Sequence, residues 1–161
     1  FEDIQNHVPT YLGAPSVQGS IYNDDQLSET FIAYNTFIDC HVGAFLGGGR
    51  HHMIVNNTFI RSGASHVHQD DRGLTWQKSY CTPPNGTFFQ ELDAVHYKQP
   101  PFSTEYPMLP DVANAMPCKP AYNTITGNRY CGPSKFADFD VNQYVTDYAN
   151  VIQDNVEFTG C

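Results

Sequence analysis

The stretch Gly43–Gly73, GAFLGGGRHHMIVNNTFIRSGASHVHQDDRG, decides the fold. It joins a glycine-rich turn to an Asn-Asn-Thr-Phe step and ends in an alternating His, Asp and Arg segment. Its glycines do not predict a phosphate-binding loop, because the lysine and the Ser/Thr of that motif are missing and no helix-forming run follows. The stretch is informative because similar patterns occur on both sides of it.

An Ile-x-x-Asn step recurs four times along the chain. In the first three copies an aromatic residue follows two positions after the Asn, and in the fourth it follows one position later. The copies run from Ile32 to Phe37, Ile54 to Phe59, Ile125 to Tyr130 and Ile152 to Phe158. One such step would mean little, but four with nearly the same aromatic offset indicate a repeating structural unit.

A second alignment gives the length of the repeat. The segments Ile21–Asp25, Ala44–Gly48 and Val67–Asp71 align with offsets of 23 residues, and Asn35 precedes Asn57 by 22. A repeat this short, with strands separated by Asn and Gly turns, is typical of one coil of a parallel β-solenoid. We therefore predict an all-β fold in which equivalent residues of neighbouring coils lie about 4.8 Å apart.

The predicted coils place side chains of two kinds. Ile21, Ala44 and Val67 are expected to point inward and stack in the core. Four asparagines are expected to hydrogen-bond to their copies on the next coil and to satisfy backbone groups at the bend; they are Asn35, Asn57, Asn128 and Asn155.

The sequence predicts a single domain over residues 1–161. Regular coils are expected over 19–73 and 121–161, and residues 1–18 are expected to complete a partial coil. The period is lost over 74–120, where eight of the eleven prolines fall. We interpret that segment as a long proline-rich loop inserted in the solenoid, and loops of this length are usually functional.

The cysteines and glycosylation motifs indicate an extracellular setting. The five cysteines lack the CxxC spacing of a zinc site, so disulfides are the better interpretation. Cys81 pairs naturally with Cys118 across the insertion, and Cys131 and Cys161 follow equivalent turns. The odd cysteine is available to crosslink neighbouring molecules. Two Asn-x-Thr acceptors, at Asn56 and Asn85, agree with secretion and glycosylation.

The net charge restricts the partners. Eight basic against seventeen acidic side chains give a formal charge of −9, which disfavours nucleic acid or an anionic membrane surface. No run approaches the length of apolar sequence needed to span a membrane. Cations, neutral polymers or basic partners are favoured instead.

The alternation of the predicted strands directs a second set of side chains outward. Tyr22, Phe45 and His68 form one exposed column, and Asp24, Gly47 and Asp70 form the next; these aromatic and carboxylate groups suit a polysaccharide or other glycan. The backbones of Asp24 and Asp70, two coils apart, are expected to be about 9.6 Å from each other. Carboxyl separations of about 6.5–9.5 Å are typical of inverting glycosidases.

These columns give the candidate site residues. The catalytic candidates are Asp24, Asp70, His68 and Arg72, and the substrate-binding candidates are Tyr22, Phe45, Gly47 and Arg50. Arginine beside Asp70 favours its ionised form, so Asp24 or Asp25 is the better general acid. The alternative is that these acids and Arg72 form a hydrogen-bonded turn network that ends the strand.

Two metal sets are chemically reasonable, although no cofactor is required. Calcium could be held by Asp24, Asp25, Asp70 and Asp71. A second set joins His66 and His68, which the alternation places on one strand face, with further ligands from His51, His52 or His96. Cα positions two and four residues apart along a strand are too distant for His66, His68 and Asp70 to share one ion.

The motifs resemble those of right-handed parallel β-helix proteins of the pectate-lyase-like superfamily. The resemblance covers about residues 19–130 and is closest to secreted members with four motifs: Tyr-x-Asp-Asp at Tyr22, Gly-Gly-Gly-Arg at Gly47, Asn-Asn-x-Phe at Asn56, and His-x-Asp-x-Arg-Gly at His68. It implies a right-handed helix with coils of about 22–23 residues. It implies little about activity, because the superfamily includes lyases, hydrolases, epimerases, binding proteins and fibre components.

The chain also departs from that group. His51-His52 follows the glycine-rich turn where such proteins commonly have Asp-Asn. The basic residue and calcium-binding carboxylates of the lyases do not map onto this chain, so hydrolase or lyase-like catalysis stays open. Two functions are therefore predicted: binding or processing of extracellular carbohydrate, and, alternatively, a fibre or matrix subunit built by end-to-end stacking of uncapped solenoids.

Overall fold

Short strands account for most of the regular structure. The computed structural model describes residues 19–140 and 142–161, so the partial coil predicted over residues 1–18 lies outside the described residues. The strands are β1 Gly19–Asn23, β2 Phe31–Ala33, β3 Thr36–Ile38, β4 Val42–Leu46, β5 Met53–Val55, β6 Thr58–Ile60, β7 Ser65–Gln69, β8 Thr124–Thr126, β9 Arg129–Cys131, β10 Lys135–Phe139, β11 Val151–Gln153 and β12 Val156–Glu157.

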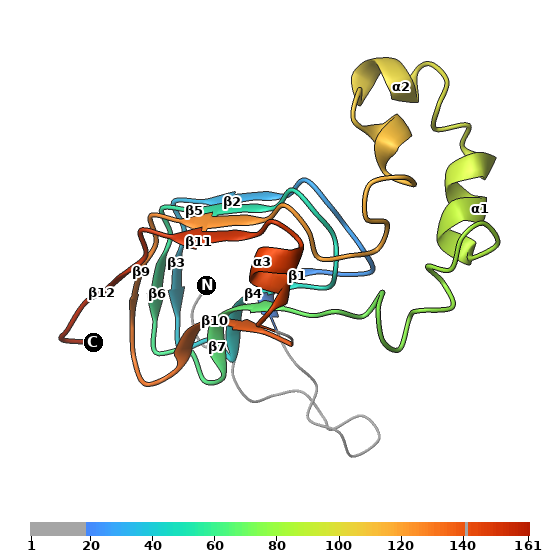
Figure 1. The fold of residues 1–161 in the computed structure, drawn as a ribbon. Coiled ribbons are helices and arrows are strands. Elements are labelled where there is room, and N and C mark those ends of the chain that lie inside the picture. Colours follow the sequence, from blue (N-terminus) through green and yellow to red (C-terminus); the bar gives the residue numbers. More distant parts are fainter. Residues whose placement is uncertain (1–18, 141) are drawn as a thin grey trace. The chain divides into compact units, whose positions relative to one another are not determined.

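The strands form three sheets in which every neighbouring pair is parallel. Their orders are β1-β4-β7-β10, β11-β8-β5-β2 and β12-β9-β6-β3. The chain therefore visits the three sheets in turn and returns to the first after each coil, so that equivalent strands stack side by side (Figure 1). This mostly-β arrangement of parallel sheets is consistent with the predicted β-solenoid.

The observed register agrees with both sequence alignments. Ile21 pairs with Ala44 and Ala44 with Val67 in the first sheet. Ile32, Ile54, Ile125 and Ile152 pair in the second, and Phe37, Phe59 and Tyr130 in the third. In the fourth coil Glu157, not Phe158, takes the aromatic position opposite Tyr130. Apart from Glu157, which is exposed, these residues meet in one core cluster, where the rings of Phe37 and Phe59 stack with centroids 4.7 Å apart.

Asparagine side chains link the coils at the bend between the second and third sheets. The Oδ1 atom of Asn57 accepts from the backbone N–H of Asn35 at 2.9 Å, and Asn128 and Asn155 continue the series with bonds of 2.9 and 3.0 Å. The residue before each asparagine has a positive φ, as at Tyr34 (59°). The asparagine ladder predicted from the sequence is thus confirmed.

A second ladder, which the sequence alignment missed, lies before the second sheet. The backbone N–H of His52 donates to Asn123 Oδ1, and that of Asn123 to Asn150 Oδ1, both at 2.9 Å. His52 occupies the asparagine position in its own coil, where its Nδ1 accepts from the N–H of Thr30 at 3.4 Å. Each of these residues stands two positions before a repeated isoleucine, so the complete repeat is Asn-x-Ile-x-x-Asn.

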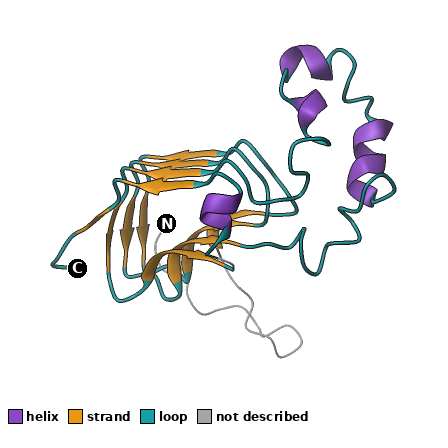
Figure 2. Ribbon diagram, in the orientation of Figure 1, coloured by secondary structure: helices purple, strands orange, loops and turns teal. Residues whose placement is uncertain are grey.

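The insertion is a compact unit and not only a loop. The chain divides into a solenoid unit, whose described residues are 19–71, 120–140 and 142–161, and an inserted unit, residues 72–119. The single-domain organisation, with an inserted segment over residues 74–120, stays a prediction. Within the inserted unit lie helix α1 (Thr87–Ala94), helix α2 (Phe102–Glu105) and the 3-10 helix η2 (Leu109–Asp111); helix α3 (Tyr144–Asp147) belongs to the solenoid unit (Figure 2).

Both expected disulfides are present, but the odd cysteine is not at the surface. Cys81 pairs with Cys118 and Cys131 with Cys161, with Cα–Cα distances of 5.9 and 6.2 Å. Cys40 lies outside both disulfides and is buried in the core cluster. The prediction that the odd cysteine is available to crosslink neighbouring molecules is therefore wrong for the folded chain.

Replacing Cys81 and Cys118 together with serine is expected to loosen the inserted unit alone. The disulfide closes a loop of 37 residues, and its loss increases the conformational freedom of the open state of that unit. Amide hydrogen exchange in α1 should become at least tenfold faster. Amides of β5 and β8 in the solenoid unit provide the internal control, and faster exchange there as well would contradict the independence of the two units.

Within the described residues, no helix is both long enough and apolar enough to cross a membrane.

Candidate functional site

A column of rings lies on the outer side of the first sheet. Tyr22, Phe45 and His68 occupy equivalent positions on β1, β4 and β7. The ring centroids are 4.3 Å apart between Tyr22 and Phe45 and 5.0 Å apart between Phe45 and His68, in stacked geometry. Asp138 takes the next position, on β10. The column therefore runs from two aromatic rings through an imidazole to a carboxylate.

A second column is formed by the residues that directly follow these strands. In coil order they are Asp24, Gly47, Asp70 and Asp140. The backbone N–H groups of the last three each donate to the carbonyl that ends the strand of the preceding coil, at 2.6, 3.0 and 3.2 Å. The parallel ladder thus continues one residue beyond the sheet and stacks these positions at its edge.

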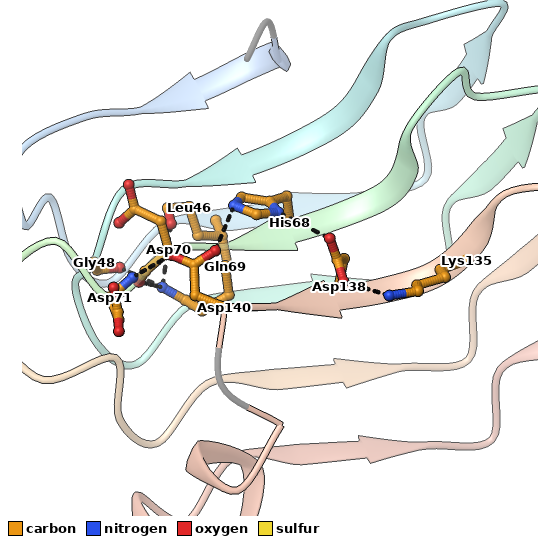
Figure 3. Close-up of polar contacts among 9 residues, drawn as sticks. All are labelled: Leu46, Gly48, His68, Gln69, Asp70, Asp71, Lys135, Asp138 and Asp140. Atoms are coloured by element: carbon orange, nitrogen blue, oxygen red, sulfur yellow. Dashed lines mark hydrogen bonds and ion pairs between the residues drawn. The ribbon is translucent and has the colours of Figure 1, made fainter. Parts of the chain in front are cut away.

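His68 lies where the two columns meet, between two carboxylates (Figure 3). Its Nδ1 is 3.6 Å from Asp138 Oδ2, and its Nε2 is 3.5 Å from Asp140 Oδ1. The His68 side chain is 14% exposed, whereas those of Asp138 and Asp140 are 37% and 39% exposed. We call these three residues the His68 cluster; it is open to solvent through its carboxylates.

The two carboxylates have different surroundings. Burial raises the pKa of Asp140, and the nearby Asp71 and Asp70 carboxylates act in the same direction; the N–H of Asp71, which donates to Asp140 Oδ2 at 3.1 Å, and His68 oppose them only in part. Asp138 instead accepts a hydrogen bond from Lys135 Nζ at 3.1 Å. The protonated form is therefore more favoured for Asp140 than for a free aspartate, whereas Asp138 is paired with Lys135.

Gln69 holds the backbone behind the cluster. Its buried Nε2 donates to the carbonyls of Leu46 at 3.2 Å and Gly48 at 2.9 Å, and its Oε1 accepts from Asn123 Nδ2 at 3.0 Å. One side chain thus joins the end of β7 to the turn of the preceding coil and to the second ladder. The strand end that carries His68 is fixed by these bonds.

The predicted strip is less open than the sequence suggested. Phe45 is only 3% exposed and Gly47 is buried, so the expectation of an exposed ring followed by an open gap is wrong at these two positions. Tyr22 is 44% exposed and remains accessible. Asp24 and Asp25 are exposed as well, and the Asp25 N–H donates to Asp24 Oδ1 at 3.0 Å.

The other predicted site residues are mostly enclosed. Asp70, Asp71 and Arg50 are buried in the solenoid unit, and burial lowers the pKa of Arg50. Arg72, the first residue of the inserted unit, is buried, and its guanidinium lies 5.3 Å from the ring centre of Trp76. The roles of these residues in binding or catalysis stay predictions.

His66 points into the core, which corrects its assignment to the same strand face as His68. Its ring is buried, with its centroid 5.8 Å from that of Phe59 and 5.6 Å from that of Tyr130, and its Nδ1 lies 2.8 Å from Ser62 Oγ. Burial lowers the pKa of His66 to about 4. It cannot chelate an ion together with His68.

No group of three or more His, Cys, Asp or Glu side chains in residues 19–140 and 142–161 is arranged to hold a metal ion. The acids predicted to bind calcium do not form such a group; they are Asp24, Asp25, Asp70 and Asp71. Neither the calcium set nor the histidine set gains support.

Asp138 and Asp140 were missed because the insertion hides their repeat. Without residues 72–119, the offset from Val67 to Ala137 returns to 22 residues and that from Ile54 to Ile125 to 23. Aligning Ala137 under Val67 after removing the irregular segment would have placed Asp138 under His68. The repeat therefore continues after the insertion, but a search at a fixed spacing of 22–23 residues does not find it.

Comparison of the chain with protein-family models, with curated proteins and with solved structures finds no match.

Proposed function

We propose that the solenoid unit binds extracellular carbohydrate at the His68 cluster and the neighbouring Tyr22 ring. The observation that carries this proposal is the imidazole held between two solvent-open carboxylates at the end of a stack of rings. Carboxylates accept hydrogen bonds from sugar hydroxyl groups, and an imidazole can donate to them or accept from them. An exposed aromatic ring can pack against the apolar side of a sugar. Because these positions follow one another on successive coils, they could contact successive sugars of a polysaccharide.

The proposal includes the fold family and the setting. Crossovers between parallel strands of one sheet are right-handed in nearly all proteins, which favours a right-handed coil. Together with the sequence motifs, this supports membership of the pectate-lyase-like superfamily. The two disulfides favour an oxidising, extracellular location.

Asp140 is the residue through which this site would act on a glycosidic bond. Asp140 can donate a proton to the leaving oxygen of a sugar, while the Asp138 carboxylate stabilises positive charge that develops on the ring. We therefore propose Asp140, in place of Asp24 or Asp70, as the general acid. Binding without cleavage uses the same contacts, so the two activities are separated by experiment.

Replacing Asp138 or Asp140 with asparagine is expected to weaken glycan binding about tenfold, because each change replaces a carboxyl group that can hydrogen-bond to sugar hydroxyls. Glycan arrays followed by titration of the best ligand measure the effect. Asp154→Asn is the matched control, since Asp154 is an exposed carboxylate at a different corner. Digestion of polysaccharides identifies cleavage, which Asp140→Asn should abolish. Native-like binding by both cluster variants, or failure to bind any glycan, would refute the proposal.

A second candidate function is end-to-end assembly into an extracellular fibre. Val151 and Val156 are exposed on β11 and β12, which are edge strands of their sheets. Exposed edges with apolar side chains pair readily with other strands. In that case Val156→Lys should reduce assembly seen by light scattering and electron microscopy, whereas a dispersed monomer of the native chain at high concentration would exclude this function.

A further inference from the structure

Asn56 presents its amide at an exposed corner of the solenoid unit. It follows β5 with a φ of 54° and is the acceptor of an Asn-x-Thr motif that ends at Thr58. Its Nδ2 donates to the hydroxyl of Tyr34 at 3.2 Å. On the next coil, a Cβ built on Gly127 would meet Asn56 Oδ1 at 2.6 Å. The amide therefore lies across the corner, with its nitrogen toward Tyr34 and its oxygen over a glycine.

The neighbouring asparagine is unsuited to carry a modification. Asn57 is buried, and its Nδ2 donates to the carbonyls of Ile32 and Val55 and to Asn128 Oδ1. The corner thus separates the two residues of the Asn-Asn pair: the second supports the ladder, and the first faces solvent.

Tyr34 is an unusual residue for its position. It is 78% exposed and has a φ of 59°, a left-handed conformation that bulky side chains seldom adopt. The equivalent residues of the other coils are Asn56, Gly127 and Asp154, which are common in such turns. The asparagine ladder does not require an aromatic ring at this corner. Tyr34 occupies the position equivalent to Asn56 on the neighbouring coil, beside the Asn56 amide.

We propose that Asn56 carries an N-linked glycan and that the Tyr34 ring is the platform for its first sugar. In the transfer, Asn56 Nδ2 forms a bond to C1 of a lipid-pyrophosphate-linked oligosaccharide. The bond from C1 to the pyrophosphate oxygen breaks, the lipid pyrophosphate leaves, and the amide proton passes to a base of the transferase. The product keeps one N–H at Nδ2, so the hydrogen bond to the Tyr34 hydroxyl remains available.

The geometry explains why the first sugar would meet the ring. A sugar attached to a nitrogen 3.2 Å from the phenolic oxygen begins beside the Tyr34 side chain. The apolar face of a sugar packs favourably on an aromatic face. The corner lies between β5 and β6, on other sheets than the His68 cluster, so this inference is independent of the proposed carbohydrate binding.

Secretion from eukaryotic cells tests the modification. The chain is expressed with Asn85→Gln, so that Asn56 is the acceptor under test, and its intact mass is measured before and after enzymatic removal of N-glycans. Thr58→Ser keeps the motif and Thr58→Val removes it with a side chain of similar shape. A glycan is expected on the parent and the serine variant and not on the valine variant. Folded parent protein without a glycan on Asn56 overturns the proposal.

A comparison of melting temperatures tests the platform. Loss of the glycan through Thr58→Val should lower the melting temperature by about 3 °C more when Tyr34 is present than in a Tyr34→Ala background. The difference between the two backgrounds cancels the direct effect of either substitution. The same glycan-dependent change in both backgrounds would overturn the role of Tyr34.

Discussion

Replacing Asn57 with alanine is expected to lower the free energy of unfolding by about 4 kcal/mol. Asn57 is buried, and its side chain makes bonds on both sides of its coil. Its Oδ1 accepts from the N–H and the Nδ2 of Asn35, and its Nδ2 donates to the carbonyls of Ile32 and Val55. Alanine removes all of these bonds. The Val55 carbonyl keeps a bond from the Tyr34 N–H at 3.4 Å, but the other groups lose their Asn57 partner, and each buried group left unsatisfied costs about 1–3 kcal/mol.

Asn35→Ala is the matched control for this prediction. Asn35 is half-exposed, and its side chain donates to the carbonyl of Ala33 and to Asn57 Oδ1. Water can replace these bonds more easily than those of Asn57, so a loss of about 1 kcal/mol is expected. Urea denaturation at neutral pH gives both values. Equal losses for the two variants would contradict the view that the ladder stabilises the solenoid through buried backbone groups.

The asparagine ladder shows why the register could be predicted from the sequence. In a parallel solenoid each coil repeats the environment of the last, so a residue needed at one bend is needed at the same bend of the next. Asn35 and Asn57 therefore marked the period, and the isoleucine three positions before each marked the core. The second ladder was missed because His52 takes the position that Asn123 and Asn150 fill in later coils.

The candidate site was predicted only in part, for two physical reasons. Tyr22, Phe45 and His68 were aligned correctly because they precede the insertion, whereas Asp138 follows it and falls outside the fixed period. His66 was misplaced because strict alternation fails where a strand leaves a corner. Ser65 and Val67, on either side of His66, pair with Val42 and Ala44 of β4, whereas the His66 ring packs among core rings.

The exposure of the site residues depends on stacking between coils, which the inward and outward alternation along a strand does not predict. Alternation places Phe45 outward, and the structure agrees, but the ring is buried between those of Tyr22 and His68 in the stack. A side chain on the outer face of a sheet can thus be enclosed by its equivalents on the neighbouring coils. Tyr22 is 44% exposed and Phe45 only 3%, which is why the carbohydrate proposal uses Tyr22 and not Phe45.

His52 gives the chain a sensitivity to acid. It is fully buried, and burial lowers its pKa to about 4, although the nearby carbonyls of Leu27 and Gly48 act in the opposite direction. The unfolded chain binds this proton near pH 6.5, whereas the folded chain binds it only near pH 4. Stability due to His52 is therefore complete above about pH 6.5 and falls by about 1.4 kcal/mol per pH unit toward pH 4, a total of about 3 kcal/mol.

Replacing His52 with asparagine is expected to remove this loss of about 3 kcal/mol. Asparagine fills the equivalent position in the later coils, so its Oδ1 can accept from the N–H of Thr30 without titrating. The quantity to measure is the difference in unfolding free energy between pH 7.5 and pH 4, because packing changes from the smaller side chain cancel in it.

His96→Asn, which removes an exposed histidine of the inserted unit, is the control substitution with which this difference is compared. His66, whose pKa burial also lowers to about 4, remains in the His52→Asn variant and should keep a comparable share of the acid sensitivity. If the His52→Asn variant lost as much stability on acidification as the native chain, His52 would not be held neutral by the ladder, and the sensitivity would have to arise at His66 or among the carboxylates.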